Sequence, residues 1–373
     1  KKIKYMAATL LFATSFESFA DAETVEIPAA FHPLNEPLIA VLNLPAHASA
    51  EHPVPACLIV HGSGGLFSEG DVGAACDTSP ENMSENFNEV VILLDDIGVA
   101  TVAPSSFVSR DARFCEDNDS NYFQFVAPPF HNQGDGIPAR DDFYKMRRII
   151  VRTLDVFAAY NYMCSLDEVD CNNTCMAGTS NGGSTIMSYI ANGIGNHIRE
   201  YTDITQQREH ESNSNFDDRK TAFQNFPVLP LDIDDSLDNK VEPAFVSAIS
   251  PGCYLKKLVP TITADDGDFV PMEHMFDLNY PSGGTDLHLE IGTADDVPEH
   301  CHNGEVRAMQ ASDYENIMQI PAEQSQYLIS TYQDGPHDLL GEDDEGPIIR
   351  EKIKDLAIEH FYLIFKNGRF YRI

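Results

Sequence analysis

Residues 178–182 read Gly-Thr-Ser-Asn-Gly, a Gly-x-Ser-x-Gly pentapeptide with Ser180 at its centre. The residues before it, 173–177, are typical of a short buried strand, and residues 183–190 read as the opening of a helix. Between a strand and a helix, the pentapeptide predicts a tight elbow whose glycines allow close backbone approach and whose serine is strained. Such an elbow holds the serine hydroxyl above a sheet edge, near the partly positive N-terminus of the helix.

A serine hydroxyl is a weak nucleophile near neutral pH, so the elbow predicts an acid and a histidine later in the chain. Asp295 follows a strand predicted at 285–292, and the Gly-x-x-Asp spacing favours it over Asp296 as the orienting carboxylate. His337 lies in a Gly-Pro-His loop after the strand predicted at 326–332. Histidine can take the serine proton and return it to the leaving group, while the carboxylate fixes the tautomer. The alternative for each is an ordinary solvated loop residue.

An oxyanion hole is predicted from a second glycine-rich segment. The apolar run at 55–61 leads into His-Gly-Ser-Gly-Gly at 61–65. A loop of this kind presents backbone N–H groups, and we expect those of Ser63 and Asn181 to bind a developing oxyanion. His61 precedes the loop and comes before the nucleophile in the chain, so a structural role is predicted for it.

Two further segments are candidates for the substrate pocket. The aromatic loop at 122–130 contains Phe123 and Phe125, which together with Gly64 can line the mouth of the site, although the loop can equally pack on the body.

The polar segment at about 196–242 is predicted to be an insertion that caps the site. Spaced acids in it suggest a calcium loop, but the glycine and terminal glutamate of an EF-hand are missing, which favours a solvated acidic loop. These acids are Asp232, Asp234 and Asp238.

The ordered set of motifs resembles a secreted dienelactone-hydrolase-like member of the α/β-hydrolases, over roughly residues 50–366. The motifs are His-Gly-Ser-Gly-Gly at 61–65, Gly-Thr-Ser-Asn-Gly at 178–182, Ser-Pro-Gly-Cys at 250–253, Gly-Thr-Ala-Asp-Asp-Val-Pro at 292–298 and Gly-Pro-His at 335–337. The segment at 103–110 also resembles the one after the fourth strand in such proteins. Dienelactone hydrolases proper have a cysteine in the elbow, so a dienelactone substrate is not implied for a chain with Ser180. The acid motif is one residue tighter before its proline than usual, which leaves Asp295 and Asp296 both open.

Strands that alternate with helices predict an α/β fold, here the α/β-hydrolase fold, with a mostly parallel central sheet and helices on both faces. One domain is predicted over 23–373, including the cap-like insertion. Strands are expected near 24–27, 38–44, 55–61, 99–104, 244–250, 285–292 and 326–332, and helices near 84–97, 141–164 and 347–366.

The N-terminus and the charge predict where the protein is found. Residues 1–22 are basic and then apolar, with small residues before the predicted cleavage after Ala20 or Ala22, so we interpret them as a signal peptide of a secreted or periplasmic protein. No other stretch is long and apolar enough for membrane insertion. The chain has 24 Lys+Arg against 59 Asp+Glu and a net charge of −35. Such a surface repels nucleic acid and anionic membranes.

Eight cysteines suit an exported, disulfide-bonded protein. Of the 105 connectivities open to eight cysteines, three pairs are predicted: Cys253–Cys301, Cys76–Cys115 and Cys164–Cys171. Cys57 and Cys175 lie in strand-like apolar runs, where buried free thiols are the alternative to a disulfide. No Cys-x-x-Cys pair is present, which argues against a zinc site.

These patterns together predict a secreted serine hydrolase that cleaves small-molecule or polymeric carboxylic esters through an acyl-serine intermediate. No metal and no organic cofactor is expected. Two alternatives remain open: the same triad acting on amide bonds as an amidase or peptidase, and a catalytically silent binding protein with the same fold.

Overall fold

The computed structural model describes most of the body of the chain. The described residues are 22–28, 37–62, 65–67, 77–106, 138–190, 194–207, 213, 216–217, 220, 241–250, 262–263, 269–270, 285–292, 327–332, 340, 345–361, 363–366 and 369–372. Nearly all of the predicted signal peptide, the aromatic loop at 122–130 and much of the predicted insertion at 196–242 lie outside them. None of the helices in these ranges has the length and apolar character needed to cross a bilayer.

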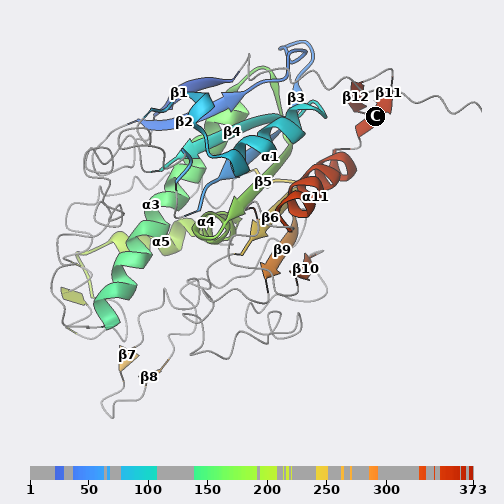
Figure 1. The fold of residues 1–373 in the computed structure, drawn as a ribbon. Helices are drawn as coiled ribbons and strands as arrows, with labels where there is room; N and C mark the ends of the chain where they lie inside the picture. Colours follow the sequence, from blue (N-terminus) through green and yellow to red (C-terminus); the bar gives the residue numbers. More distant parts are fainter. Residues whose placement is uncertain are drawn as a thin grey trace, which may run out of the picture.

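An eight-stranded sheet forms the centre of the molecule, in the spatial order β1-β2-β4-β3-β5-β6-β9-β10 (Figure 1). Strand β2 is antiparallel to both of its neighbours, and every pair from β4 to β10 is parallel. The strands are β1 (Glu23–Ile27), β2 (Leu38–Asn43), β3 (Val54–Val60), β4 (Ala100–Ser105), β5 (Val169–Thr179), β6 (Phe245–Ile249), β9 (Asp286–Gly292) and β10 (Tyr327–Tyr332). Two separate two-stranded pieces pair β7 (Ile262–Thr263) with β8 (Phe269–Val270) and β11 (Leu363–Lys366) with β12 (Arg369–Arg372).

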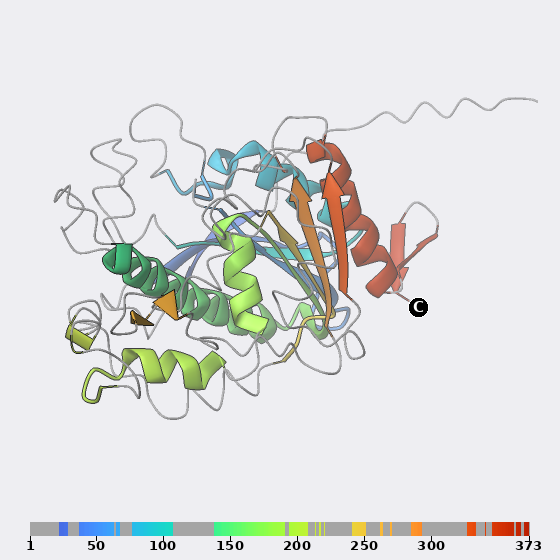
Figure 2. The same cartoon turned by 90° about the horizontal axis from the view of Figure 1, so that it is seen from below.

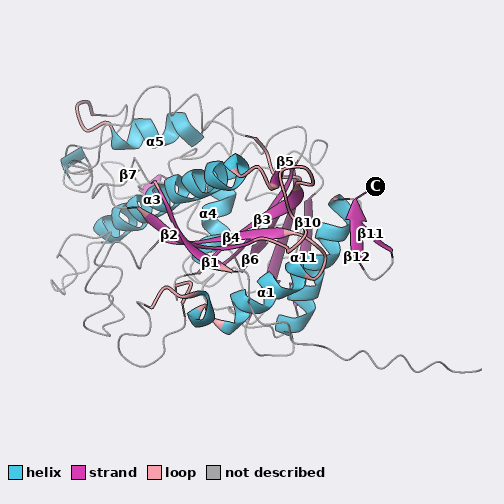
Figure 3. Cartoon of the chain, turned by 90° about the horizontal axis from the view of Figure 1, so that it is seen from above, coloured by secondary structure: helices cyan, strands magenta, loops and turns pink. Residues whose placement is uncertain are grey.

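Helices cover both faces of this sheet (Figure 3). Figure 2 shows α1 and α11 on one side of the sheet, and α3 and α4 on the other. The helices are α1 (Glu85–Asp95), α3 (Pro138–Ser165), α4 (Asn181–Ile190), α5 (Ile194–Thr202) and α11 (Glu345–His360), with a short 3₁₀ turn, η2 (Pro80–Asn82).

The central strands are apolar on both sides because each side packs against helices. In β3, Leu58 and Val60 belong to the core shared with α3 and α4, whereas Cys57 and Ile59 belong to the core shared with α1 and α11. Successive side chains of a strand point to opposite faces, so a strand buried on both faces gives a continuous apolar run. This explains why the run at 55–61 was recognisable in the sequence.

The predicted strands outside the elbow differ from the observed bounds by no more than one residue at either end. The prediction for the last helix was wrong at its C-terminus. It was expected to run to residue 366, but α11 ends at His360 and the chain then forms β11, which pairs with β12. The sequence between these strands is Asn367-Gly368, a strong hairpin signal that the helical periodicity obscured.

Two disulfides lie within the described residues. Cys164–Cys171 confirms one predicted pair and closes the short connection between α3 and β5. Cys57 and Cys175, which none of the predicted pairs includes, are bonded to each other, so the alternative of buried free thiols was wrong. They are register partners on the adjacent strands β3 and β5, with their Cα atoms 4.5 Å apart, which is within disulfide range. In the chain-entropy account, closing so long a loop stabilises the fold by about 5 kcal/mol. The other two predicted pairs, Cys76–Cys115 and Cys253–Cys301, lie outside the described residues.

Candidate active site

Ser180 occupies the turn between β5 and α4 and has a positive φ of 51°. Residues other than glycine rarely adopt this left-handed conformation, which persists only where the surroundings hold it. Two hydrogen bonds hold it here: the Ser180 N–H donates to the Ile249 carbonyl at the end of β6 (2.8 Å), and the Ser180 carbonyl accepts from the Ser184 N–H in α4 (3.1 Å). Ser180 is partly exposed, while Thr179 and Asn181 on either side of it are buried.

The two outer glycines of the pentapeptide are required by close backbone contact. A Cβ atom on Gly182 would lie 2.2 Å from the Val60 carbonyl oxygen and 2.5 Å from that of His61. A Cβ atom on Gly178 would lie 2.8 Å from the carbonyl carbon of Gly182. These distances are shorter than any real carbon contact of this kind, so only glycine lets α4 begin directly against the end of β3.

The same close approach brings the loop after β3 next to the serine. A Cβ atom built on Gly62 would lie 3.3 Å from the Cβ atom of Ser180. Ser63 and Gly64, the predicted oxyanion donor and pocket residue, follow immediately in the chain but lie outside the described residues. Asn181, the other predicted donor, is the first residue of α4. Its N–H group therefore belongs to the partly positive end of that helix.

His61 connects the ends of β3 and β4. One ring nitrogen, Nε2, accepts a hydrogen bond from the Ser106 N–H (3.1 Å), and the other, Nδ1, donates to the Gly62 carbonyl (2.7 Å). Burial, followed by the positive charge of Arg152, holds the pKa of His61 well below its usual value, so the ring stays neutral. With both nitrogens engaged, His61 has the structural role that the sequence predicted.

A second serine with a positive φ ends the neighbouring strand. Ser250 follows β6 with φ 41°, and its N–H donates to the Glu290 carbonyl in β9 (2.7 Å). Ser180 bonds to the end of β6 in the same way, so each of these strand ends is held by the strand beside it. All of these ends lie at one edge because the carboxyl ends of parallel strands share an edge.

The strand order and this elbow decide the architecture. A sheet ordered 1-2-4-3-5-6 with an antiparallel second strand, followed by two more parallel strands, carries a strained serine directly after its fifth strand. The chain has the α/β-hydrolase fold. The predicted fold class is therefore confirmed, including helices on both faces of the sheet.

Known proteins that are similar to this chain were found among solved structures. No family model matches the chain, and no curated protein matches it. Among solved structures, it is similar to Est1E from Butyrivibrio proteoclasticus, with 13% identity and a TM-score of 0.44 over 91% of this chain and 99% of that one. It is also similar to the dienelactone hydrolase-like promiscuous phosphotriesterase P91 from metagenomic libraries, with 12% identity and a TM-score of 0.43 over 91% and 97% of the two chains. A third similar structure is dipeptidyl peptidase 4 of Porphyromonas gingivalis, with 13% identity and a TM-score of 0.45 over 91% of this chain and 35% of that one. At these TM-scores, assignment of the α/β-hydrolase fold rests on the chain's own strand order and elbow.

The remaining predicted site residues follow strands of the same edge. Strand β9 ends at Gly292, three positions before Asp295, and β10 ends at Tyr332, five positions before His337. Asp295, Asp296 and His337 lie outside the described residues, as do Phe123, Phe125 and the acids of the suggested calcium loop. Within the described ranges, no group of three or more His, Cys, Asp or Glu side chains could hold a metal ion.

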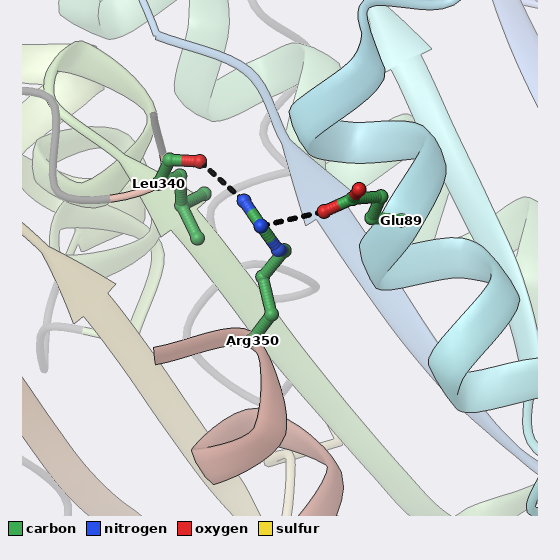
Figure 4. A network of polar contacts seen from close by, with 3 residues as sticks. All are labelled: Glu89, Leu340 and Arg350. Carbon is green, nitrogen blue, oxygen red and sulfur yellow. Dashed lines mark hydrogen bonds and ion pairs between the residues drawn. The ribbon is translucent and has the colours of Figure 1, made fainter. Parts of the chain in front are cut away.

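Arg350 binds Leu340, which is the residue nearest in sequence to His337 among those that the structure describes. From α11, its Nη1 atom donates to the Leu340 carbonyl (2.7 Å) and its Nη2 atom pairs with Glu89 of α1 (2.6 Å) (Figure 4). Arg350 and Leu340 are both buried, whereas the Glu89 side chain is 42% exposed. This guanidinium therefore joins two helices and the segment that follows the predicted catalytic histidine.

We expect Arg350→Met to lower the free energy of unfolding by about 1–3 kcal/mol, because it leaves the buried Leu340 carbonyl without its charged donor. Urea denaturation should show a lower midpoint with an unchanged slope. Lys354→Met is the matched control on the same helix. Lys354 pairs with the 56% exposed Glu351 at 3.5 Å, and its loss should change the stability by no more than about 0.5 kcal/mol. Equal midpoints for the two variants would contradict the anchoring role of Arg350.

Proposed function

We propose that this chain is a secreted serine hydrolase that cleaves carboxylic esters through an acyl-serine intermediate. The observation that carries the proposal is Ser180, a partly exposed serine held at φ 51° at the carboxyl edge of the sheet, with Gly62 beside it. A strained backbone costs stability and is typical of functional sites.

The proposed reaction uses the residues that the sequence motifs predict. His337 removes the Ser180 hydroxyl proton as the oxygen attacks the ester carbonyl carbon, and Asp295 orients the histidine and stabilises its charged form. Backbone N–H groups of Ser63 and Asn181 stabilise the oxyanion. When the intermediate collapses, the bond to the alcohol oxygen breaks and His337 donates its proton to that oxygen. Water then repeats the sequence on the acyl-serine and releases the acid.

Two features support the strand ends as the place where these groups meet. The strands that precede Ser180, Asp295 and His337 are parallel members of one sheet, so their carboxyl ends share an edge. In open α/β sheets, ligands bind outside this edge. A serine, an acid and a histidine that follow these strands can act together at this edge, although they come from distant parts of the chain.

Secretion is part of the proposal because the chemistry of the cysteines agrees with the N-terminal sequence. The two disulfides within the described residues are stable in an oxidising compartment. Residues 1–22 carry the basic and apolar pattern of a signal peptide. The substrate is expected to be neutral or cationic, because a protein with a net charge of −35 repels anions.

The proposal can be tested with pairs of chromogenic esters and anilides that share an acyl group, measured with and without added salt. Ester hydrolysis should exceed anilide hydrolysis, and a fluorophosphonate probe should add its mass to the peptide that contains Ser180. Preferential anilide hydrolysis would support the amidase alternative. Failure of both the hydrolysis and the labelling, in folded protein, would support a catalytically silent fold.

A further inference from the structure

Arg152 is a cation buried under the elbow that no sequence motif singled out. It lies in α3, and only 1% of its surface is exposed. Removing a guanidinium from water is costly unless its N–H groups are hydrogen-bonded. A charge that is buried this deeply is therefore stable only where hydrogen-bond acceptors meet its N–H groups.

Those acceptors belong to the two backbone segments that flank Ser180. The Nη1 atom of Arg152 donates to the side-chain oxygen of Asn181, and the Nη2 atom donates to the main-chain carbonyl of His61 (2.5 Å). A guanidinium only donates hydrogen bonds, so it also fixes which end of the Asn181 amide faces it. One planar group thus joins the start of α4 to the end of β3.

We propose that Arg152 is a positioning residue that fixes His61 and Gly62, at the end of β3, against Asn181, at the start of α4. The inference rests on the proposed function, in which the N–H groups of Asn181 and Ser63 bind the oxyanion. The His61 carbonyl is in the peptide unit that leads to Gly62, and Ser63 follows directly. A rigid fork with two donors at fixed separation holds both segments at once, whereas the single ammonium of lysine does not reproduce that geometry.

The charge of Arg152 contributes separately from its shape. It acts in a buried, low-dielectric region, where a positive charge stabilises a developing oxyanion more than it would in water. Its Nη2 atom donates to the His61 carbonyl, directly before Gly62, so the charge lies at the end of β3. Arg152→Lys keeps the charge and loses the fork, while Arg152→Met loses both, so the two variants separate the two effects.

Tyr160→Phe provides a matched control. Tyr160 lies in the same helix, is equally buried, and its hydroxyl hydrogen-bonds to the Thr174 hydroxyl in β5 (2.5 Å). The variant therefore removes a buried hydrogen bond between the same helix and the strand that leads to the elbow, but several residues before Ser180. A general loss of packing between α3 and the sheet would affect it as well.

Steady-state kinetics on the best ester should separate the variants. We expect Arg152→Lys to lower kcat by about 10–100-fold, less than the loss of a whole oxyanion donor, with KM changed by less than about threefold. Arg152→Met should lose more, and Tyr160→Phe should keep the kcat of the wild type. Affinity for an aryl boronic acid, which forms a tetrahedral adduct with an active serine, should fall in parallel with kcat. A drop in kcat that Tyr160→Phe shares, or a change confined to KM, would overturn the proposal.

Hydrogen–deuterium exchange on the same proteins tests the inference without relying on turnover. Arg152→Lys should speed exchange in the peptides that cover 60–65 and 180–184, and Tyr160→Phe should leave both at the wild-type rate. Unchanged exchange in both peptides of Arg152→Lys would overturn the positioning role, even in an active enzyme. Faster exchange in Arg152→Lys, together with a wild type that shows no Ser180-dependent turnover, would instead refute the proposed function and leave Arg152 as a clamp between the two segments.

Discussion

Replacing Ser180 with alanine is expected to lower kcat for ester hydrolysis by at least about 10³-fold, because the variant lacks the hydroxyl that is proposed to form the acyl intermediate. His337→Ala should cost as much, since residues that act as a unit fail together. Asp295→Asn should be severe and Asp296→Asn mild. The measurement is the single-turnover and steady-state rate on the best chromogenic ester, with folding checked by near-UV circular dichroism.

Ser188→Ala is the control for a serine in the same helix. Ser188 is buried, and its hydroxyl donates to the Ser184 carbonyl (3.0 Å), away from the elbow. Its removal should leave kcat within about threefold of the wild type, as expected for a residue outside the catalytic unit. A folded Ser180→Ala protein with wild-type activity would refute the proposed mechanism. If Asp296→Asn proved the damaging change, the acid would be Asp296 and the rest of the triad would stand.

Gly182→Ala should be the most destabilising single substitution near the site. The added methyl group would lie 2.2 Å from the Val60 carbonyl oxygen, which is part of a strand paired on both sides. Neither the strand nor the start of α4 can move without breaking several hydrogen bonds, so we expect a loss of more than about 4 kcal/mol or no folded protein. Soluble yield and urea denaturation would measure this.

Gly62→Ala is the matched comparison, because its added methyl group would meet its neighbours at longer distances. Its Cβ atom would lie 3.3 Å from the Ser180 Cβ atom and 3.3 Å from the Thr179 carbonyl oxygen, so the neighbours must shift by only a few tenths of an ångström. We expect a stability change of about 1 kcal/mol or less, with a larger effect on activity because the contact is with the proposed nucleophile. Similar stability losses in Gly62→Ala and Gly182→Ala would show that the elbow is not as closely packed as the structure indicates.

Local patterns were sufficient to predict the elements that position the elbow. The run at 55–61 and the pentapeptide at 178–182 carry their information within a few residues, in apolar continuity and glycine spacing. The order of motifs then indicated which strands share an edge. These features depend on short-range sterics and on the burial of whole strands, which a single sequence displays directly.

What the sequence did not reveal depends on neighbours in space. Pairing of Cys57 with Cys175 required the register between β3 and β5, which neither strand encodes alone. Arg152 belongs to no motif, and its importance follows only from the two acceptors that the fold brings to it. The end of α11 at His360 is hidden in the sequence because apolar residues continue from 361 to 365, although Asn367-Gly368 indicates the hairpin that follows.

The disulfide between β3 and β5 changes what a protease can do to this molecule. Cys57 and Cys175 are separated by 118 positions, and their disulfide closes the chain between them into a covalent ring. A single backbone cut anywhere inside the ring opens it without releasing a fragment. The strand that leads to the glycine loop and the strand that leads to the serine then stay bonded side by side. Such a nicked molecule should migrate as one species on a non-reducing gel and separate into two only after reduction.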